Sequence, residues 1–394
     1  MKILTISAQK PDSTGSGIYL SELVKSFRKM GIENAVVCGI DKDDNPLWED
    51  DVRFYPVHFR TDEIPFPVAG MSDLMPYEST RYKDMEAWMQ DRFEEVFLAK
   101  IEKAVAEFDP DFILCHHLYF LTALVREKFP QRKVGAVCHG SDLRQFQKTR
   151  LQNERIRSNI QKLDRVFALQ EHQKKTIADL YDLDLSKIEV IGTGYNSSVF
   201  YNKGYDRSKE EIRLIFAGKL CEKKGVFALL DALDAMNVDK EVSLYLAGGY
   251  SDEEEYQKIV SLAKNCKRKV VFLGKLNQKE LTEEFNKAHI FVLPSFYEGL
   301  PLVIVEALSC GLKVVATDLP GVQQWINSNL SNHRISFVKP PKMHNVDDPD
   351  EEFLGEFVED LTHSLEEAVK EYDGPVICDT KSISWDGVAK KIVK

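Results

Sequence analysis

Long apolar runs are missing from this chain of 394 residues, and no stretch approaches the roughly 20 apolar residues that a membrane-spanning helix needs. An excess of basic residues is missing as well, because 52 Lys and Arg stand against 63 Asp and Glu, a net charge of −11. A dedicated nucleic-acid binder needs a basic surface, so this charge argues against that class. The opening segment Met1–Ser7 is too short for a signal-peptide core and is typical of a first strand. We therefore expect a cytoplasmic protein, with contact at the inner membrane surface left open.

Cysteine patterns that would indicate a disulfide framework or a zinc site are also lacking. The seven cysteines are an odd number, are scattered, and show no Cys-x-x-Cys spacing. Asp-x-Asp occurs four times, beginning at residues 41, 109, 182 and 348, each time in a turn-like acidic stretch. We interpret these pairs as coincidence in an acid-rich chain, and we expect neither a metal nor a cofactor.

Strand-like and helix-like segments alternate along both halves of the chain. The strands are apolar throughout, which predicts parallel sheets covered on both faces and hence an α/β fold. A polar cluster at Asn196–Lys209 marks the boundary between two domains. Two segments depart from the alternation: 41–95, which we interpret as a long insertion, and the Pro/Asp-rich loop 340–352.

The most informative stretch holds two glutamates eight residues apart, Glu298 and Glu306. A short apolar strand precedes it, Pro301 is well placed as the first residue of a helix, and Gly311 as its stop. The loop between strand and helix thus brings a carboxylate to a helix N-terminus. Free N–H groups there suit a phosphate, and carboxylates accept hydrogen bonds from hydroxyls. A ligand with both phosphates and many hydroxyls is a nucleotide sugar.

Further motifs accompany the glutamate pair in a fixed order. They are Gly15-Ser-Gly17, His139-Gly-Ser-Asp142, Ile191-Gly-Thr-Gly-Tyr-Asn196, Phe216-Ala-Gly-Lys219 with Lys224-Gly225, and Leu246-Ala-Gly-Gly249. With this set, nearly the whole chain resembles the GT-B-fold retaining glycosyltransferases of family four, the glycogen-synthase-like group 1 transferases.

The resemblance implies two Rossmann-like domains with parallel sheets facing across a cleft. Residues 1–197 would bind the acceptor, 198–375 the nucleotide sugar, and the helix within 376–394 would cross back to the N-terminal domain. The implied reaction moves a hexosyl unit from a nucleotide sugar, with UDP the expected nucleotide, to a hydroxyl acceptor with retention. Glycan or glycolipid synthesis, such as that of cell-surface polysaccharides, is the implied setting. The alternatives are a non-catalytic partner subunit of the same fold and another nucleotide-sugar enzyme such as an epimerase.

Donor-binding roles follow from the same resemblance. Lys219 and Lys224 would hold the diphosphate, and a cation there also stabilises the departing nucleotide. Glu306 would accept hydrogen bonds from the ribose, and Glu298 from the donor sugar. The predicted donor-binding residues are Gly15, Gly17, Gly218, Lys219, Lys224, Gly299, Leu300, Pro301, Leu302 and Glu306.

The resemblance also assigns catalytic roles to His139, Glu298 and Lys224. The family places a histidine like His139 near the transferred sugar. Candidates for the acceptor are His117, which closes a strand, and Tyr77 and Tyr82 of the aromatic-rich insertion. Aromatic side chains on an inserted loop suit stacking on a sugar or a lipid carrier, and a packed structural loop is the competing interpretation.

A basic stretch, Arg144–Lys162, raises the question of contact with anionic lipid. It lacks a clear stripe of large apolar residues, so we favour an ordinary solvated helix. Peripheral membrane contact stays an open alternative.

Overall fold

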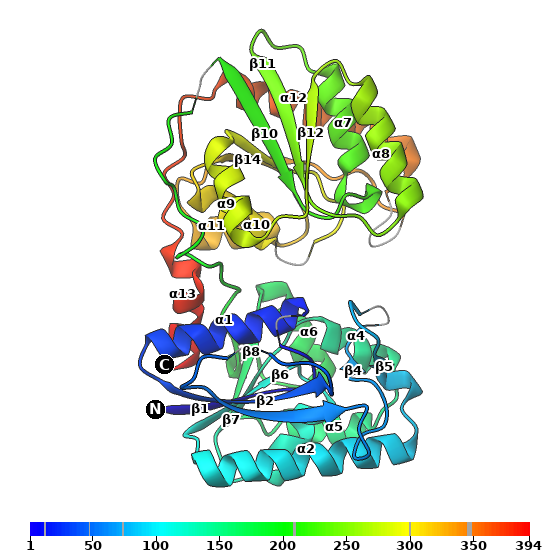
Figure 1. Ribbon diagram of the computed structural model, residues 1–394, viewed down its shortest axis with the longest axis vertical. Helices are drawn as coiled ribbons and strands as arrows, with labels where there is room; N and C mark the ends of the chain where they lie inside the picture. The colour runs from blue at the N-terminus through cyan, green and yellow to red at the C-terminus, as the bar shows by residue number, and fades with distance from the viewer. Residues whose placement is uncertain (12, 47, 73–74, 208–209, 299–300, 345–348) are drawn as a thin grey trace. The chain divides into compact units, whose positions relative to one another are not determined.

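Two compact α/β units make up the structure, a computed structural model in which residues 1–394 are described except 12, 47, 73–74, 208–209, 299–300 and 345–348 (Figure 1). Unit 1 comprises Met1–Gly194 and Trp385–Lys394, and unit 2 comprises Tyr195–Ser384. The units divide after Gly194 and after Ser384. The boundaries expected from the sequence were after residues 197 and 375. Both units contain parallel sheets with helices, which confirms the predicted α/β class.

Unit 1 is built on a parallel sheet that runs through its centre. The strand order is β3 (Arg53–Phe59), β2 (Glu33–Asp41), β1 (Lys2–Ser7), β6 (Phe112–His116), β7 (Val134–Val137), β8 (Arg165–Ala168) and β9 (Ile188–Val190). The helices are α1 (Gly15–Lys29), α2 (Ala87–Phe108), α3 (Phe120–Lys128), α4 (Ser141–Lys148), α5 (Asn153–Ile160), α6 (Glu171–Tyr181) and α13 (Trp385–Ile392). Figure 1 shows α1 and α2 on opposite faces of this sheet. Because both faces are covered, the central strands β6 and β7 are buried along their whole length.

The first helix begins earlier than the sequence pattern indicates. In the sequence the apolar helical pattern starts only at Ile18, after Gly15-Ser-Gly17, but α1 starts at Gly15. The reason is a cap: Gly17 N donates to the Thr14 hydroxyl over 3.1 Å, which satisfies one free N–H of the first turn. Gly15 and Gly17 therefore lie within the first helical turn.

The expected insertion 41–95 proves to be partly regular structure. It contributes β3, which pairs in parallel with β2 at the edge of the sheet, and the start of α2. Between them, β4 (Ala69–Gly70) and β5 (Thr80–Arg81) form a small separate ladder. The alternation is still broken, because no helix of the described residues separates β2 from β3, and only short elements lie between β3 and α2.

Unit 2 repeats the architecture with a second parallel sheet. The strand order is β12 (Lys269–Gly274), β11 (Glu241–Ala247), β10 (Glu211–Ala217), β13 (Ile290–Leu293), β14 (Lys313–Thr317) and β15 (Ile335–Val338). The helices are α7 (Val226–Ala235), α8 (Glu253–Asn265), α9 (Gln278–Lys287), α10 (Leu302–Ser309), α11 (Val322–Asn329) and α12 (Leu354–Lys370). From β10 to β12 each new strand is added on one side of the sheet, and the chain then returns to the other side of β10 to form β13. Strands β10 and β13 are therefore neighbours although they are far apart in sequence. Ligands of open α/β sheets bind at such a switch point, beyond the carboxyl ends of the strands.

The closing helix α13 packs within unit 1. Gly194 leaves no space for a side chain there, because a Cβ atom would lie 2.5 Å from Trp385 N. Arg165 donates hydrogen bonds to the carbonyls of Lys391 and Ile392, and Lys391 Nζ donates to Ile191 O over 3.1 Å. The last ten residues therefore complete the first unit after the chain has built the second.

Candidate functional site

The loops that follow β10 and β13 carry several of the predicted site residues of unit 2. Because these strands are parallel neighbours, both loops leave the same edge of the unit 2 sheet. The loop after β10 holds Gly218, Lys219 and a short 3-10 turn at Glu222–Lys224. The loop after β13 holds Glu298 and leads into α10. The sequence predictions for unit 2 are thus gathered at one end of the sheet.

Lys224 and Glu298 form an ion pair at this edge. Lys224 Nζ lies 2.6 Å from Glu298 Oε1, and the hydroxyl of Ser295 donates to the same oxygen over 2.9 Å. The two side chains are largely covered, with exposed fractions of 26% and 18%. Since an ammonium group has three N–H donors, Lys224 can hold Glu298 and a phosphate oxygen at once. Ser295 was not among the predicted residues, and a lone serine before an aromatic gives no distinctive signal.

Close backbone contacts lock these two loops together. Phe296 N donates to Lys223 O over 3.0 Å. Gly225 has a φ of +69°, and a Cβ atom there would lie only 2.0 Å from Pro294 O. Glycine at 225 is therefore required twice, for its backbone conformation and for the approach of the neighbouring loop.

Glu306 lies on α10 and differs in environment from Glu298. Its carboxyl group makes no hydrogen bond with the described residues, and burial raises its pKa to about 7. Burial has this effect because it penalises the charged form. A carboxyl group that is held near neutrality and has no hydrogen-bond partner among the described residues is suited to pair with ligand hydroxyls.

The start of α10 carries four of the predicted donor residues. Gly299 and Leu300 lie outside the described residues. Pro301 precedes the helix, which begins at Leu302, one position later than expected, and no described side chain caps it. At the other end Gly311, with a φ of +83°, confirms the predicted stop. Among the described residues, the first N–H groups of α10 therefore lack a side-chain acceptor.

Lys219 lies on the outer side of this edge. It is exposed and makes no ion pair within the described ranges of the chain. The glycine before it packs tightly: Gly218 N donates to Ala247 O over 2.9 Å, and a Cβ atom on Gly248 would lie 1.7 Å from Gly218 O. The motifs after β10 and β11 thus need glycine because the two backbones approach each other too closely for a side chain.

In unit 1, His139 belongs to a cluster of three histidines at the carboxyl ends of β6 and β7. Its Nε2 lies 3.0 Å from His116 Nδ1, and the two rings stack with centroids 5.2 Å apart. Tyr19 of α1 packs edge-on against His139 at 5.1 Å. Burial, with a smaller contribution from His117 nearby, lowers the pKa of His139 to about 3, so the ring is neutral at physiological pH. A neutral His139 acts as a hydrogen-bond partner, not as a cation.

Asp142, quoted with His139 in the sequence motif, has a structural task. Its carboxylate is fully buried and accepts from the backbone N–H groups of Leu118, His139 and Leu143, at 2.7, 3.3 and 3.1 Å. These bonds hold the turn between β7 and α4. Asp142 thereby fixes the backbone that presents His139.

The predicted acceptor residues lie deeper than expected. His117 is 2% exposed, has a φ of +73°, and its Nε2 lies 3.1 Å from Gln9 Oε1. Tyr82 is 1% exposed and packs on Tyr119, so it belongs to the core and cannot stack on a ligand in this conformation. Tyr77 is half-buried beneath the ammonium group of Lys10. The packed-loop interpretation of this segment therefore agrees better with the structure.

Gln9 links His117 to the start of α1. Its side-chain oxygen accepts a hydrogen bond from the Ser16 hydroxyl over 3.0 Å, and that hydroxyl lies 3.1 Å from Thr14 Oγ1. No atom would lie within 4 Å of a Cβ on Gly15, so the protein itself does not require glycine at that position. Gln9 and Tyr19 were missed from the sequence because nothing local distinguishes them.

The described residues contain no cluster of three or more His, Cys, Asp or Glu side chains placed to hold a metal ion. In the part of the chain with assigned coordinates, no helix is both long and apolar enough to cross a bilayer. In the basic stretch, Arg155 pairs with Glu94 and Glu127, and Arg157 lies over the Phe146 ring. These contacts are typical of a solvated helix surface.

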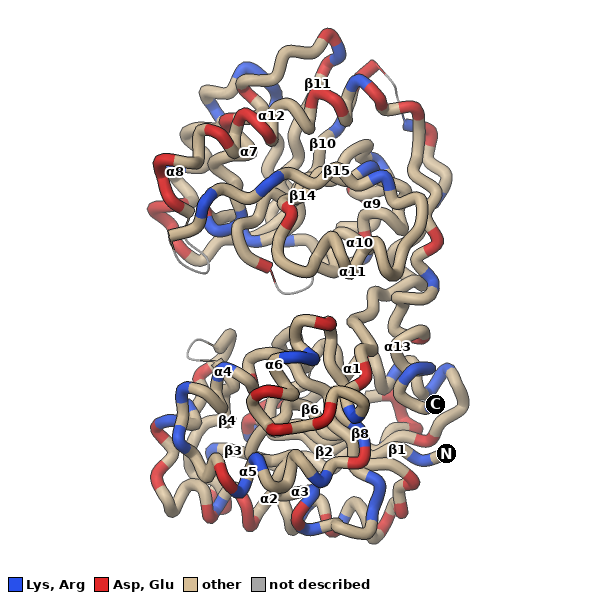
Figure 2. The backbone as a smooth tube through the Cα atoms, turned by 180° about the vertical axis from the view of Figure 1, so that it is seen from behind, with Lys and Arg blue, Asp and Glu red and all other residues tan. Residues whose placement is uncertain are grey.

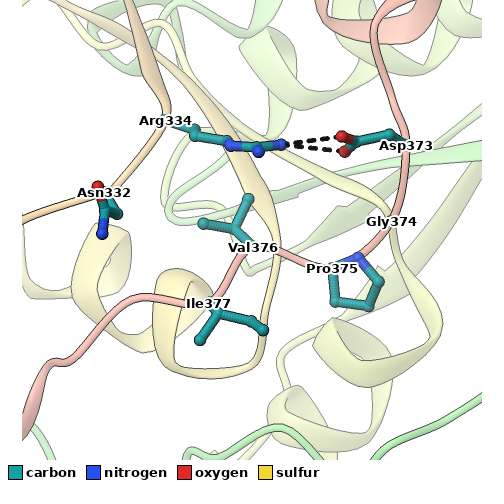
Figure 3. Close-up of a pocket in the computed structure, with 7 residues that line it drawn as sticks. All are labelled: Asn332, Arg334, Asp373, Gly374, Pro375, Val376 and Ile377. Atoms are coloured by element: carbon teal, nitrogen blue, oxygen red, sulfur yellow. Dashed lines mark hydrogen bonds and ion pairs between the residues drawn. The ribbon is translucent and has the colours of Figure 1, made fainter.

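A separate cavity of about 520 Å³ lies in unit 2 at the opposite edge of the sheet (Figure 3). Part of its wall, Asn332 and Arg334, precedes β15, and Pro375 lies against Gly311, which precedes β14. Arg334 is already paired with Asp373 at 3.0 Å across the opening. This cavity is therefore remote from the loops that follow the strands, and its charges are compensated.

Comparisons with known proteins agree with this geometry. Residues 13–199 match the family model described as Glycosyltransferase Family 4, and residues 200–346 match the model described as Glycosyl transferases group 1. The two matches adjoin and follow the two units closely.

Individual relatives point the same way. TuaC of Bacillus subtilis (strain 168), whose name assigns it to teichuronic acid biosynthesis as a glycosyltransferase, is 24% identical over 86% of each chain. The amylovoran biosynthesis glycosyltransferase AmsK of Erwinia amylovora is 28% identical over 57% of each chain. Among solved structures, HepE of Anabaena in complex with UDP aligns with a TM-score of 0.62 and 14% identity, over 100% of this chain and 98% of that one. This protein therefore belongs to the group 1 glycosyltransferases of family four and has the GT-B fold.

Proposed function

We propose that this glycosyltransferase moves a hexosyl unit from a UDP-sugar to a hydroxyl acceptor, with retention at the anomeric carbon, in the synthesis of a polysaccharide or glycolipid. The observation that carries the proposal is the Lys224–Glu298 pair on the adjoining loops after β10 and β13, together with Glu306 of the following helix α10, whose carboxyl group has no hydrogen-bond partner among the described residues. The cation Lys224 suits the diphosphate of a single donor. The oriented carboxylate of Glu298 suits its sugar, and the near-neutral carboxyl group of Glu306 suits its ribose.

Each group has a defined task in this proposal. Lys224 and Lys219 hold the diphosphate and stabilise the charge that develops on it as the nucleotide departs. Glu298, fixed by Lys224 and Ser295, accepts hydrogen bonds from the sugar hydroxyls. Glu306 accepts hydrogen bonds from the ribose. His139, neutral and oriented by His116, offers one ring nitrogen to the transferred sugar.

In the proposed reaction the acceptor hydroxyl attacks the anomeric carbon from the side of the leaving group. The bond from this carbon to the diphosphate oxygen breaks, the new glycosidic bond forms, and the acceptor proton passes to the diphosphate oxygen. No protein nucleophile is needed. Glu298 is held by an ammonium group and a hydroxyl, which suits a hydrogen-bonding carboxylate better than an attacking one.

The names of relatives support the choice of substrates. HepE was crystallised with UDP, and TuaC and AmsK carry names of polysaccharide biosynthesis. A second candidate, a non-catalytic partner subunit, would have no need of the oriented Lys224–Glu298 pair.

The test is a thermal-shift panel with UDP, GDP, ADP and dTDP, without added metal. Ligand at about 100-fold over Kd stabilises by roughly 2.7 kcal/mol, which raises Tm by a few degrees for domains of this size. We expect a selective shift with UDP. A selective shift with another nucleotide would replace the donor, and no shift with any of them would favour the non-catalytic subunit.

A further inference from the structure

An exposed aromatic pair stands at the carboxyl end of β11. The rings of Tyr250 and Tyr256 are stacked, with centroids 3.9 Å apart and 8° between their planes. Tyr256 packs edge-on against Phe272 of β12 at 6.0 Å, which anchors the pair to the sheet. Tyr256 covers one face of the Tyr250 ring, yet Tyr250 is 46% exposed, so its other face is open to solvent. A further planar group can stack there.

The pair is tied to the loop that carries the donor lysines. Leu220 N donates to Gly249 O over 2.8 Å, which joins the residue after Lys219 to the residue before Tyr250. One turn further on, Glu222 N donates to the Glu255 side chain over 2.6 Å. Lys219 and Tyr250 therefore project from two loops whose backbones are hydrogen-bonded to each other, above the neighbouring strands β10 and β11.

The surface that extends from Lys219 to Tyr250 differs in charge between its two ends. The start of α8 is strongly acidic, with Asp252 as its cap and Glu253, Glu254 and Glu255 in its first turn (Figure 2). An anion beside Tyr250 would be repelled, whereas a neutral ring would not. Lys219, in contrast, is an exposed cation without an ion-pair partner among the described residues. The surface thus fits a ligand with an anionic end and a neutral planar end.

We propose that Tyr250, backed by Tyr256, is the stacking platform for the nucleobase of the donor, with the diphosphate at Lys219 and Lys224. This inference rests on the proposed function, because it takes the nucleotide sugar as the ligand of unit 2. Every nucleobase has a π-face, so stacking on Tyr250 strengthens binding of all nucleotides alike and does not choose between bases.

The experiment compares Tyr250→Ala and Tyr250→Phe with the wild type by titration calorimetry. The ligands are UDP, or the nucleoside diphosphate selected by the thermal-shift panel, and inorganic pyrophosphate, which has no base. We expect Tyr250→Ala to weaken nucleotide binding by about tenfold or more, a size typical of base–aromatic stacking. Tyr250→Phe keeps the ring and should bind within about twofold of the wild type. Pyrophosphate should bind equally to all three proteins.

Tyr201→Ala is the matched control, since Tyr201 is 48% exposed in the same unit and precedes β10. It should leave both affinities unchanged. Wild-type affinity for the nucleotide in Tyr250→Ala would overturn the platform and leave the proposed function intact. An equal loss of nucleotide and pyrophosphate binding would also overturn it, because Tyr250 would then act only by holding the loop. Failure of the wild type to bind any nucleoside diphosphate would instead remove the proposed function, and the platform with it.

Discussion

Lys224 Nζ lies 2.6 Å from Glu298 Oε1, so two residues that the sequence assigns to different parts of the donor touch each other in the structure. Each limits the side-chain freedom of the other, and Ser295 fixes the carboxylate further. The two side chains thus hold each other in place in a largely covered part of unit 2.

Neutralising each partner should therefore have a different effect. In Lys224→Met the cation is lost, and we expect the affinity for UDP to fall about tenfold or more, as for the loss of one charge-assisted hydrogen bond. Glu298→Gln keeps the shape and leaves Lys224 free for phosphate, so UDP affinity should stay at the wild-type level while turnover drops at least about tenfold. Calorimetry and steady-state rates measure the two effects. Equal losses of UDP affinity in both variants would show that the pair works as one binding unit.

Glu306 should make stability depend on pH. Its pKa is raised by burial from 4.5 to about 7, so the folded protein holds this proton more tightly than the unfolded chain. The stabilisation is complete below pH 4.5 and is lost as the pH rises through 7. In Glu306→Gln this loss is absent, and we expect the variant to gain up to roughly 3 kcal/mol relative to the wild type between pH 4.5 and 8.5. Urea unfolding across this range measures the difference, and parallel profiles would exclude a raised pKa.

The same group should control nucleotide affinity. Glu306→Ala removes the acceptor of the ribose hydrogen bonds, and we expect UDP binding to weaken about fivefold or more. Affinity of the wild type for a UDP-sugar should also decline as the pH falls below 7, because a protonated carboxyl is a poorer acceptor. Unchanged affinity in Glu306→Ala would sink the assignment of Glu306 to the ribose.

Gly225 should tolerate no side chain. Ala at this position would need the left-handed conformation and would place Cβ 2.0 Å from Pro294 O, displacing the loop that carries Glu298. We expect Gly225→Ala to lose at least about 2 kcal/mol of stability and most of its turnover. Gly355→Ala in α12 is the control, since no atom lies within 4 Å of its Cβ position, and it should keep its turnover and lose no stability, because alanine favours a helix. Wild-type turnover in Gly225→Ala would mean that the loop contact is dispensable.

His139 should stay neutral wherever the enzyme is active. Burial holds the pKa of His139 and of His117 at about 3, so neither ring should titrate between pH 5 and 8 in NMR spectra. His139→Ala should lower turnover with little change in UDP affinity. A titration of His139 near neutrality would instead assign it a proton-transfer role.

Turnover should persist in EDTA. In the proposed reaction Lys224 and Lys219 supply the cation that stabilises the departing diphosphate, so a divalent ion has no required task there. Rates with and without chelator, compared in protein that has been dialysed against EDTA, test this. Loss of turnover on chelation and its recovery with added Mg²⁺ or Mn²⁺ would contradict the assignment.

The sequence by itself determined the class of fold and the position of the donor loops. Apolar strands alternating with amphipathic helices require buried parallel sheets, and the short apolar strand expected before the glutamate pair is present as the fully buried β13. The stop of α10 at Gly311 was equally readable, because a left-handed residue after a helix strongly favours glycine. These features depend on residues that are close in sequence, so local sequence patterns predict them.

Only the tertiary structure decided which side chains meet. The Lys224–Glu298 pair joins residues 74 positions apart, and Gln9 reaches His117 across 108. Strand order brings them together, and no periodicity encodes strand order. Burial was decided in the same way: Tyr82 resembled an exposed loop aromatic but lies in the core, whereas Tyr250 gave no signal until its ring was found stacked and open. The physical reason is that exposure and partnership depend on how distant segments pack, and the sequence of one segment does not contain that information.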